Sequence, residues 1–288
     1  MLRLPRLQRV SSPRLGETNR VEFFKERPIS ALLLDAFGTL ITASEPEGRV
    51  YLRYAQRYGC NLSEQEVVQK FGTLYNAACR GVKARYIKDG RAFWGPVISQ
   101  ATGCMQPALL DELYEYYSQN NAWHVCVHAK EALSRLRSLG IKTAVVSDFD
   151  TRLQPLLQTL GLADLFDAVI VSAEIGADKP DPRMFLAACA ALKVTCADAV
   201  HVGDDIRRDV EGAKAIGCRA WLWGYDVRSM AEVAARLHGI NLKWKRKSST
   251  RRRKCIICPR TPGFQGLYTY VKVGRCIYNA DCHCSGLA

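Results

Sequence analysis

The 288-residue sequence has no long apolar run and no other marker of a membrane or secreted protein. No stretch approaches the roughly 18 consecutive apolar residues that a membrane-crossing helix requires, so we expect no membrane span. The N-terminus also lacks the continuous apolar segment of a secretory signal peptide. The composition, 48% hydrophobic and 24% charged, is that of an ordinary globular chain.

The 12 cysteines show no spacing typical of a disulfide framework. Seven of them are scattered through the body of the chain, mostly in apolar helix-like or strand-like contexts, which suits buried free thiols in a reducing compartment. These seven are Cys60, Cys79, Cys104, Cys126, Cys189, Cys196 and Cys218.

The remaining five cysteines lie in a basic tail, residues 243–288. Cys255 and Cys258 have zinc-knuckle spacing, and further ligands follow at Cys276, Cys282, His283 and Cys284. Because the second half has no matching paired spacing, a disordered basic extension is favoured over a Zn²⁺ site. A C-terminus wrongly assigned in the gene model is a further alternative.

The net charge of +13 is concentrated at the two ends of the chain. Residues 1–28 carry a net +4 and residues 243–288 a net +10, whereas residues 29–242 sum to −1. Basic ends can bind nucleic acid or anionic membranes. Because no recognition motif accompanies the charge, we favour solvated tails and expect no specific nucleic-acid partner.

The N-terminal segment, residues 1–28, is rich in arginine and has a single acidic residue, Glu17, before Val21. This is the pattern of an organelle transit peptide, although Ser11 and Ser12 are its only serines. The pattern favours a mitochondrial or plastid location. The alternatives are a leader with no address and a cytoplasmic protein.

Short apolar segments alternate with helical patterns through most of residues 129–223. Such alternation predicts an α/β fold, a Rossmann-like parallel sheet with helices on both faces. The expected strands are Ala31–Phe37, Lys142–Ser147, Ala168–Ser172, Ala199–Gly203 and Arg219–Trp223. The expected helices are Lys130–Leu139, Leu153–Leu160, Pro182–Leu192, Arg208–Ile216 and Met230–His238.

Residues 45–125 carry only helical patterns, with no convincing strand among them. We therefore expect an all-helical cap subdomain inserted after the first strand of a domain that spans residues 29–242. The expected helices are Arg49–Tyr58, Glu64–Ala78, Ala92–Ala101 and Ala108–Gln119. Six basic cap residues either meet an anionic substrate or form a solvated face: Arg49, Arg53, Lys70, Arg80, Arg85 and Arg91.

Polar side chains lie at or shortly after the carboxyl ends of four of the expected strands. Asp35 lies in the first, Ser147 ends the second, Lys179 follows the third, and Asp204 and Asp209 follow the fourth. Ligands of doubly wound sheets bind beyond the carboxyl ends of the strands, so these groups should converge on one crevice. Taken singly, each is explained by a helix cap or a turn.

The order of these groups resembles the four motifs of the haloacid dehalogenase superfamily, over residues 29–226. The loop that starts at Asp35 and continues with Gly38-Thr39-Leu40 carries the resemblance, together with the Gly203-Asp204 pair and its following Asp209. An inserted helical cap is similar to the capped subgroup, which includes L-2-haloacid dehalogenases, phosphoglycolate phosphatases and β-phosphoglucomutases.

The resemblance implies a role for each group. Asp35 would be the nucleophile that forms a covalent aspartyl intermediate, and also a Mg²⁺ ligand. Asp204 would be the second carboxylate ligand, and Asp209 would support the metal shell. Ser147 would donate a hydrogen bond to a transferring oxygen, and Lys179 would offset the charge of nucleophile and substrate.

The sequence departs from the phosphatases of this superfamily at Phe37. They place a second aspartate there, which protonates the leaving oxygen and then activates water. General acid–base groups contribute about 10²–10⁴-fold to a rate. We therefore expect a phosphatase-like hydrolase of weak or unusual activity on a small phosphorylated metabolite, better suited to acyl phosphates or phosphoanhydrides than to alkyl phosphates.

Two alternatives stay open. An aromatic residue at position 37 is typical of the metal-independent L-2-haloacid dehalogenases, whose halide leaving group needs no proton. Those enzymes typically carry Ser and Asn where this chain has Gly203 and Asp204, which argues against them. The second alternative is a catalytically weak ligand-binding or regulatory protein. The sequence leaves the substrate and the oligomeric state undetermined.

Overall fold

The computed structural model describes residues 29–80 and 85–237. The leader at 1–28 and the tail at 243–288 lie outside the described residues, and with them the transit address and the zinc ligands expected there. Among the described residues no helix is both long enough and apolar enough to cross a membrane.

Five parallel strands form the central sheet, in the order β5-β4-β1-β6-β7. Their bounds are β1 (Ala31–Leu34), β4 (Lys142–Ser147), β5 (Ala168–Val171), β6 (Ala199–Gly203) and β7 (Arg219–Leu222). The central strand β1 places Ala31 opposite both Lys142 and Ala199, and all four of its residues are fully buried. This confirms the predicted α/β class with a parallel sheet covered on both faces.

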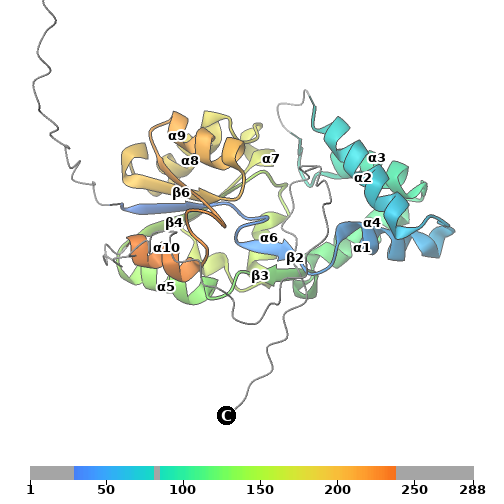
Figure 1. Ribbon diagram of the computed structural model, residues 1–288, viewed down its shortest axis with the longest axis horizontal. Helices are drawn as coiled ribbons and strands as arrows, with labels where there is room; N and C mark the ends of the chain where they lie inside the picture. Colours follow the sequence, from blue (N-terminus) through green and yellow to red (C-terminus); the bar gives the residue numbers. More distant parts are fainter. Residues whose placement is uncertain (1–28, 81–84, 238–288) are drawn as a thin grey trace, which may run out of the picture. The chain divides into compact units, whose positions relative to one another are not determined.

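Helices cover the two faces of the sheet in separate groups (Figure 1). One face carries α5 (Ala129–Ser138), α6 (Leu153–Thr159) and α10 (Met230–Leu237), and the other carries α8 (Pro182–Leu192) and α9 (Gly212–Ala215). Successive residues of β1 point to opposite faces. Leu32 and Leu34 therefore join the first hydrophobic core, and Ala31 and Leu33 join the second.

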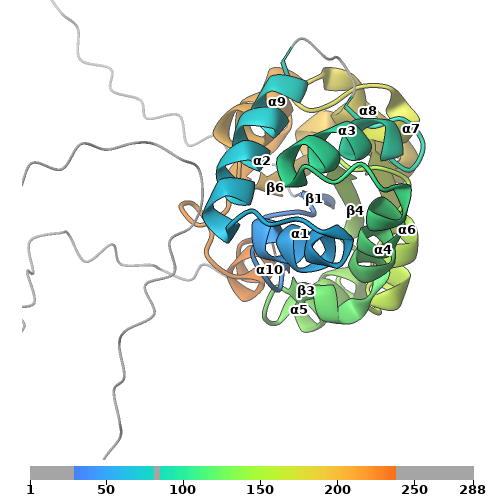
Figure 2. The same cartoon turned by 90° about the vertical axis from the view of Figure 1, so that its right-hand side faces the viewer.

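Four helices follow β1 and precede β4 along the chain: α1 (Glu47–Ala55), α2 (Glu64–Ala78), α3 (Arg91–Thr102) and α4 (Pro107–Ser118). We call them the helical insertion; Figure 2 turns them toward the viewer. They have a hydrophobic core of their own, which includes Val67, Val97 and Leu109. Ser63 and Glu66 form a capping box that fixes the start of α2.

Two short strands bracket the helical insertion, and the sequence interpretation missed both. β2 (Ile41–Ala43) and β3 (Trp123–Val125) pair antiparallel, with Ile41 opposite Val125. The expectation of no strand within residues 45–125 was therefore wrong at its end, where β3 lies; β2 precedes that range. Three residues are too few to show an alternating pattern, and the pairing joins segments far apart in the sequence.

Short helical turns complete the fold. They are η1 (Gln56–Tyr58), η2 (Asn120–Ala122), η3 (Ala163–Leu165), α7 (Ser172–Ile175), η4 (Cys196–Asp198) and the π-helical η5 (Ile206–Glu211).

The core around α8 gives a test of this architecture. Phe185 is fully buried and meets the His201 ring edge to face at 5.0 Å between centroids, whereas its neighbour Leu186 is 47% exposed. Phe185→Ala should lower the free energy of unfolding by about 3–5 kcal/mol because it leaves a cavity. Leu186→Ala should change it by less than about 0.5 kcal/mol. Denaturant unfolding of both variants checks this, and equal losses would contradict the assigned faces of α8.

Candidate active site

Asp35 stands directly beyond the carboxyl end of β1, in the middle of the sheet. Its backbone N–H donates to the Val202 carbonyl of β6 at 2.9 Å, and the residue is only 5% exposed. The chain then turns at Gly38, which has a φ of +93°. A Cβ at Gly38 would overlap the Asp204 carboxylate, so this position requires glycine for both its conformation and its space.

A buried lysine joins two of the predicted carboxylates. The Nζ atom of Lys179 lies 2.6 Å from Asp35 Oδ1 and 2.6 Å from Asp209 Oδ1. The Ser147 hydroxyl, at the end of β4, donates to Asp35 Oδ1 at 3.3 Å. All four residues are buried. The structure thus brings together side chains that come from four separate segments of the chain.

Three carboxylates form a compact cluster at this edge of the sheet. Oxygen atoms of Asp35, Asp204 and Asp209 lie within 4.8 Å of one another. Asp204 is exposed, whereas the other two are buried, so the cluster opens toward solvent at Asp204. A Cβ at Gly203 would overlap Asp209, which shows how closely the backbone approaches the cluster. Oxygen donors so arranged fit a hard divalent cation such as Mg²⁺.

The turn that carries Asp209 differs from the helix predicted over Arg208–Ile216. Helical structure starts earlier, at Ile206, and is π-helical through Glu211 before α9 begins. π-Helical turns are rare and are found frequently at functional sites. The Asp209 Oδ2 atom accepts a hydrogen bond from the Asp205 N–H at 3.1 Å, which holds the carboxylate toward Lys179.

Burial and charge set the ionisation of these groups. Burial raises the pKa of Asp35 to about 7, aided by Asp209 and Asp204 and opposed by Lys179. Burial lowers the pKa of Lys179, but Asp35 and Asp209 outweigh it and raise the pKa, so the amine stays charged. Lys179 and His201 hold the pKa of Asp209 low against its burial. Further positive charge near Asp35 would favour its ionised form.

Two residues that the sequence interpretation did not assign support the cluster. His201, fully buried on β6, donates from Nε2 to Asp209 Oδ1 at 2.8 Å. Asp148 accepts the Lys179 backbone N–H at 2.7 Å and so positions the lysine. Asp148 directly follows Ser147, a signal that could have found it. A lone histidine in an apolar strand gives no such signal.

Arg85, one of the six basic residues noted in the sequence, connects the chain before α3 to the sheet. Its guanidinium donates to Asp178 at 2.6 Å, to Asp148 at 2.7 Å and to the Tyr75 hydroxyl at 2.9 Å. It is 6% exposed. Arg49, by contrast, forms an exposed pair with Glu64. Arg85 therefore lies within a buried ion network rather than on a solvated face.

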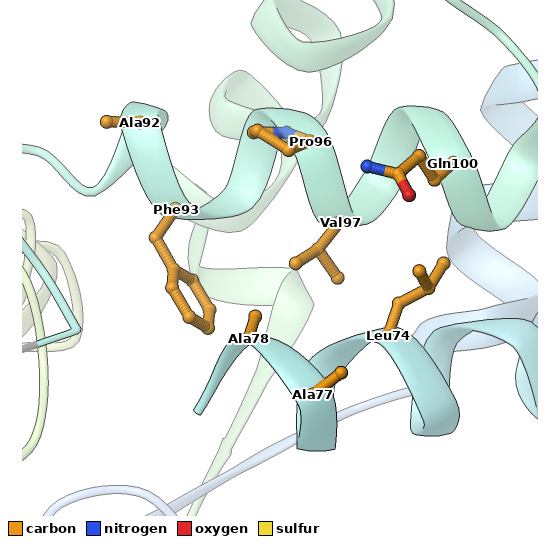
Figure 3. A pocket seen from close by; sticks show the side chains of 8 residues that line it. All are labelled: Leu74, Ala77, Ala78, Ala92, Phe93, Pro96, Val97 and Gln100. Atoms are coloured by element: carbon orange, nitrogen blue, oxygen red, sulfur yellow. The ribbon is translucent and has the colours of Figure 1, made fainter. Parts of the chain in front are cut away.

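A pocket of about 290 Å³ lies beside this network. Its lining consists of Cys79, Arg85, Asp178, Lys179, Pro180, Arg207 and Arg208, and thus includes four cationic side chains. A second pocket of about 310 Å³ lies between α2 and α3 (Figure 3). Its lining is apolar apart from Gln100 and contains no ionisable side chain, so it has no groups for the expected chemistry.

Phe37 stands two residues after Asp35, in the loop beyond β1. Its side chain is 45% exposed and its ring meets Trp123 of β3 edge to face, with 6.1 Å between centroids. A phenyl group cannot transfer a proton. The arrangement therefore places a buried carboxylate, a buried amine and a cluster of three carboxylates together, with no proton donor at position 37.

Comparison with known proteins gives the following matches. A family model for haloacid dehalogenase-like hydrolases matches residues 29–217. The mouse (Mus musculus) haloacid dehalogenase-like hydrolase domain-containing protein 3 is 34% identical over 202 residues, 66% of this chain and 80% of the mouse protein. Ribulose-1,5-bisphosphate 5-phosphatase of Halopiger xanaduensis is 31% identical over 64% of this chain and 79% of its own length.

Solved structures of a phosphatase and a dehalogenase share the fold of this chain. A HAD phosphatase from Thermococcus onnurineus is 26% identical, with a TM-score of 0.56 and coverage of 73% of this chain and 98% of that protein. An L-2-haloacid dehalogenase from Xanthobacter autotrophicus shares the fold at 23% identity, a TM-score of 0.52 and coverage of 73% and 83%.

The Arg85 network leads to a test by paired variants. Arg85→Met should lower the free energy of unfolding by about 3–5 kcal/mol, because it leaves the largely buried Asp148 and Asp178 without their nearest cation. Arg49→Met removes an exposed pair and should cost no more than about 1 kcal/mol. Denaturant unfolding measures both, and similar losses would mean that Arg85 is not part of a buried network.

Proposed function

Because this chain belongs to the haloacid dehalogenase-like hydrolase family, we propose that it is a Mg²⁺-dependent phosphatase acting through an aspartyl phosphate on Asp35. The observation that carries the proposal is the position of Lys179 Nζ, 2.6 Å from Asp35 and 2.6 Å from Asp209. This amine offsets the negative charge of the nucleophile where a phosphoryl group would arrive.

The chemistry divides into two displacements. In the first, an Asp35 carboxylate oxygen attacks phosphorus, and the bond to the leaving oxygen breaks with its electron pair on that oxygen. In the second, a water oxygen bonds to phosphorus as the P–O bond to Asp35 breaks, which regenerates the Asp35 carboxylate and releases inorganic phosphate with the water proton passing to solvent. The Ser147 hydroxyl and Lys179, both in contact with Asp35 Oδ1, can donate to a phosphoryl oxygen beside that atom.

The Asp35, Asp204 and Asp209 carboxylates would hold the cation. When bound, Mg²⁺ supplies positive charge that reduces the repulsion between carboxylate and phosphate. The same charge favours the ionised Asp35, whose pKa burial otherwise raises to about 7.

Phe37 limits which substrates react well. An alkoxide leaves poorly without a proton donor, whereas the carboxylate of an acyl phosphate leaves without one. The aspartyl phosphate must then be hydrolysed with no base at position 37, so we infer that this second displacement is the slow one. Arg207 and Arg208, in the pocket that Lys179 also lines, suit an anionic metabolite, and the pocket volume of about 290 Å³ suits a small one.

A metal-independent dehalogenase is the second candidate, and Phe37 is the observation that favours it. The carboxylate cluster argues against it. Three carboxylates within 4.8 Å of one another repel unless a cation compensates them, and the one lysine that contacts them among residues 29–80 and 85–237 supplies one positive charge for three groups. The helical insertion would act as a cap that restricts access to the site.

Acetyl phosphate gives the direct assay. The wild-type protein should release phosphate from it in the presence of Mg²⁺ and lose that activity when the cation is chelated. Asp35→Asn should reduce release to the level without enzyme, since the amide is not a nucleophile. Asp164→Asn, an exposed aspartate away from the cluster, should retain full activity. Equal release by wild type and Asp35→Asn would refute the proposal.

Restoring the missing proton donor gives an independent test. Phe37→Asp should raise kcat/KM for an alkyl phosphate such as glycerol phosphate by about 10²–10⁴-fold. Phe37→Asn has nearly the same shape but cannot transfer a proton, and should give no rise. An equal change in both variants would show that the effect comes from space at position 37 rather than from proton transfer.

A further inference from the structure

Three cysteines lie together at the end of the sheet opposite to Asp35, near the amino ends of the strands. Cys189 belongs to α8, Cys196 begins the η4 turn that leads into β6, and Cys218 directly precedes β7. They therefore gather near the amino ends of β6 and β7, whereas the carboxylate cluster lies beyond the carboxyl ends of β1 and β6. The proposed phosphatase chemistry uses none of them.

Their sulfur atoms have the spacing of ligands that share one ion. All three lie within 4.8 Å of one another, and Cys189 Sγ is 4.0 Å from Cys218 Sγ. Sulfurs bound to one ion at about 2.3 Å stand about 3.8 Å apart in tetrahedral geometry and about 4.0 Å apart in trigonal geometry. A disulfide would require about 2.05 Å. The three thiols are thus free, and little movement would place them around a common cation.

The surroundings of the cluster indicate which kind of cation would bind. Cys189 and Cys218 are 3% and 4% exposed and belong to the apolar core beneath α8, together with Leu192 and Ala199. Cys196 is partly exposed and gives access from solvent. The cluster contains sulfur donors alone, with no carboxylate or imidazole in it among the described residues. All-sulfur sites select soft, thiophilic cations and not Mg²⁺.

We propose that Cys189, Cys196 and Cys218 form a binding site for a thiophilic d¹⁰ cation, Zn²⁺ or Cu⁺, separate from the phosphatase site. Zn²⁺ fits better on charge, because three thiolates around it leave one net negative charge in an apolar setting, whereas Cu⁺ leaves two. The partly exposed side at Cys196 would leave the fourth position of Zn²⁺ to water.

The bound cation would link α8 to β6 and β7, two strands that are already paired in the sheet. α8, the start of β6 and the start of β7 would share one ion, and this part of the fold would gain stability in proportion to the occupancy of the site. Because the cluster is separate from Asp35, Mg²⁺-dependent chemistry would not require this second ion.

The test uses the full-length reduced protein, stripped of metal and equilibrated with Zn²⁺ against a competing chelator. The wild type should retain one more Zn²⁺ per chain than Cys196→Ser, and Zn²⁺ should raise the Tm of the wild type but not of Cys196→Ser. Cys126→Ser, which alters a partly buried cysteine outside the cluster, should behave as wild type in both measurements. Equal Zn²⁺ content in wild type and Cys196→Ser would overturn the proposal.

Two controls keep the outcome decisive. A Cys255→Ser/Cys258→Ser variant removes the paired cysteines of the tail, and the Zn²⁺ ion assigned to the cluster must remain in it. Far-UV circular dichroism of metal-free Cys196→Ser checks its folding. Should it not fold, alkylation of Cys196 in the wild type replaces the variant: Zn²⁺ should slow this reaction at least tenfold, and an unchanged rate would overturn the proposal.

The same assays with Cu⁺ under anaerobic conditions distinguish the two ions. Tighter binding of Cu⁺ than of Zn²⁺, lost in Cys196→Ser, would assign the site to cuprous ion. Phosphate release from acetyl phosphate by Cys196→Ser should equal that of the wild type, so that failure of the cysteine site and failure of the proposed phosphatase are separate results.

Discussion

The site depends on the ion pairs that the charged amine of Lys179 forms with Asp35 and Asp209. Without it, Asp35 and Asp209 would be two buried carboxylates with no compensating charge, a costly arrangement inside a protein. Hydrogen bonds hold Lys179 at its backbone and at the tip of its side chain. Its backbone N–H donates to Asp148, and its Nζ donates to the carboxylates of Asp35 and Asp209. The order of the sheet makes this possible, since β1 lies between β4 and β6 and their carboxyl ends meet at one edge.

Under the proposed chemistry, the site holds the groups that form a covalent intermediate and lacks one that would help to release it. The Ser147 hydroxyl and the Lys179 amine both contact the Asp35 carboxylate, whereas the position from which the proposal would have a proton given and later taken holds Phe37. The two halves of the reaction therefore depend on the protein to different extents. Substrates with good leaving groups should phosphorylate Asp35 readily. The aspartyl phosphate should then persist longer than it would beside an aspartate at position 37.

The sequence predicted the large features because they depend on local pattern. The bounds of α2 and α8 match those predicted, and the polar groups at the strand ends do converge. The failures concern long-range contacts. β2 and β3 are short and pair across the whole insertion, and the buried state of Arg85 depends on Asp148 and Asp178, distant in sequence. His201 could not be distinguished from an ordinary core residue until its contact with Asp209 was seen.

The most direct test of the account is to look for the intermediate itself. The protein is mixed with Mg²⁺ and acetyl phosphate, quenched in acid during turnover, digested and analysed by mass spectrometry. We predict a phosphoryl group on the peptide that contains Asp35, removable by hydroxylamine as expected of an acyl phosphate. Steady phosphate release with an unmodified Asp35 peptide, or with the phosphoryl group on another residue, would contradict the account.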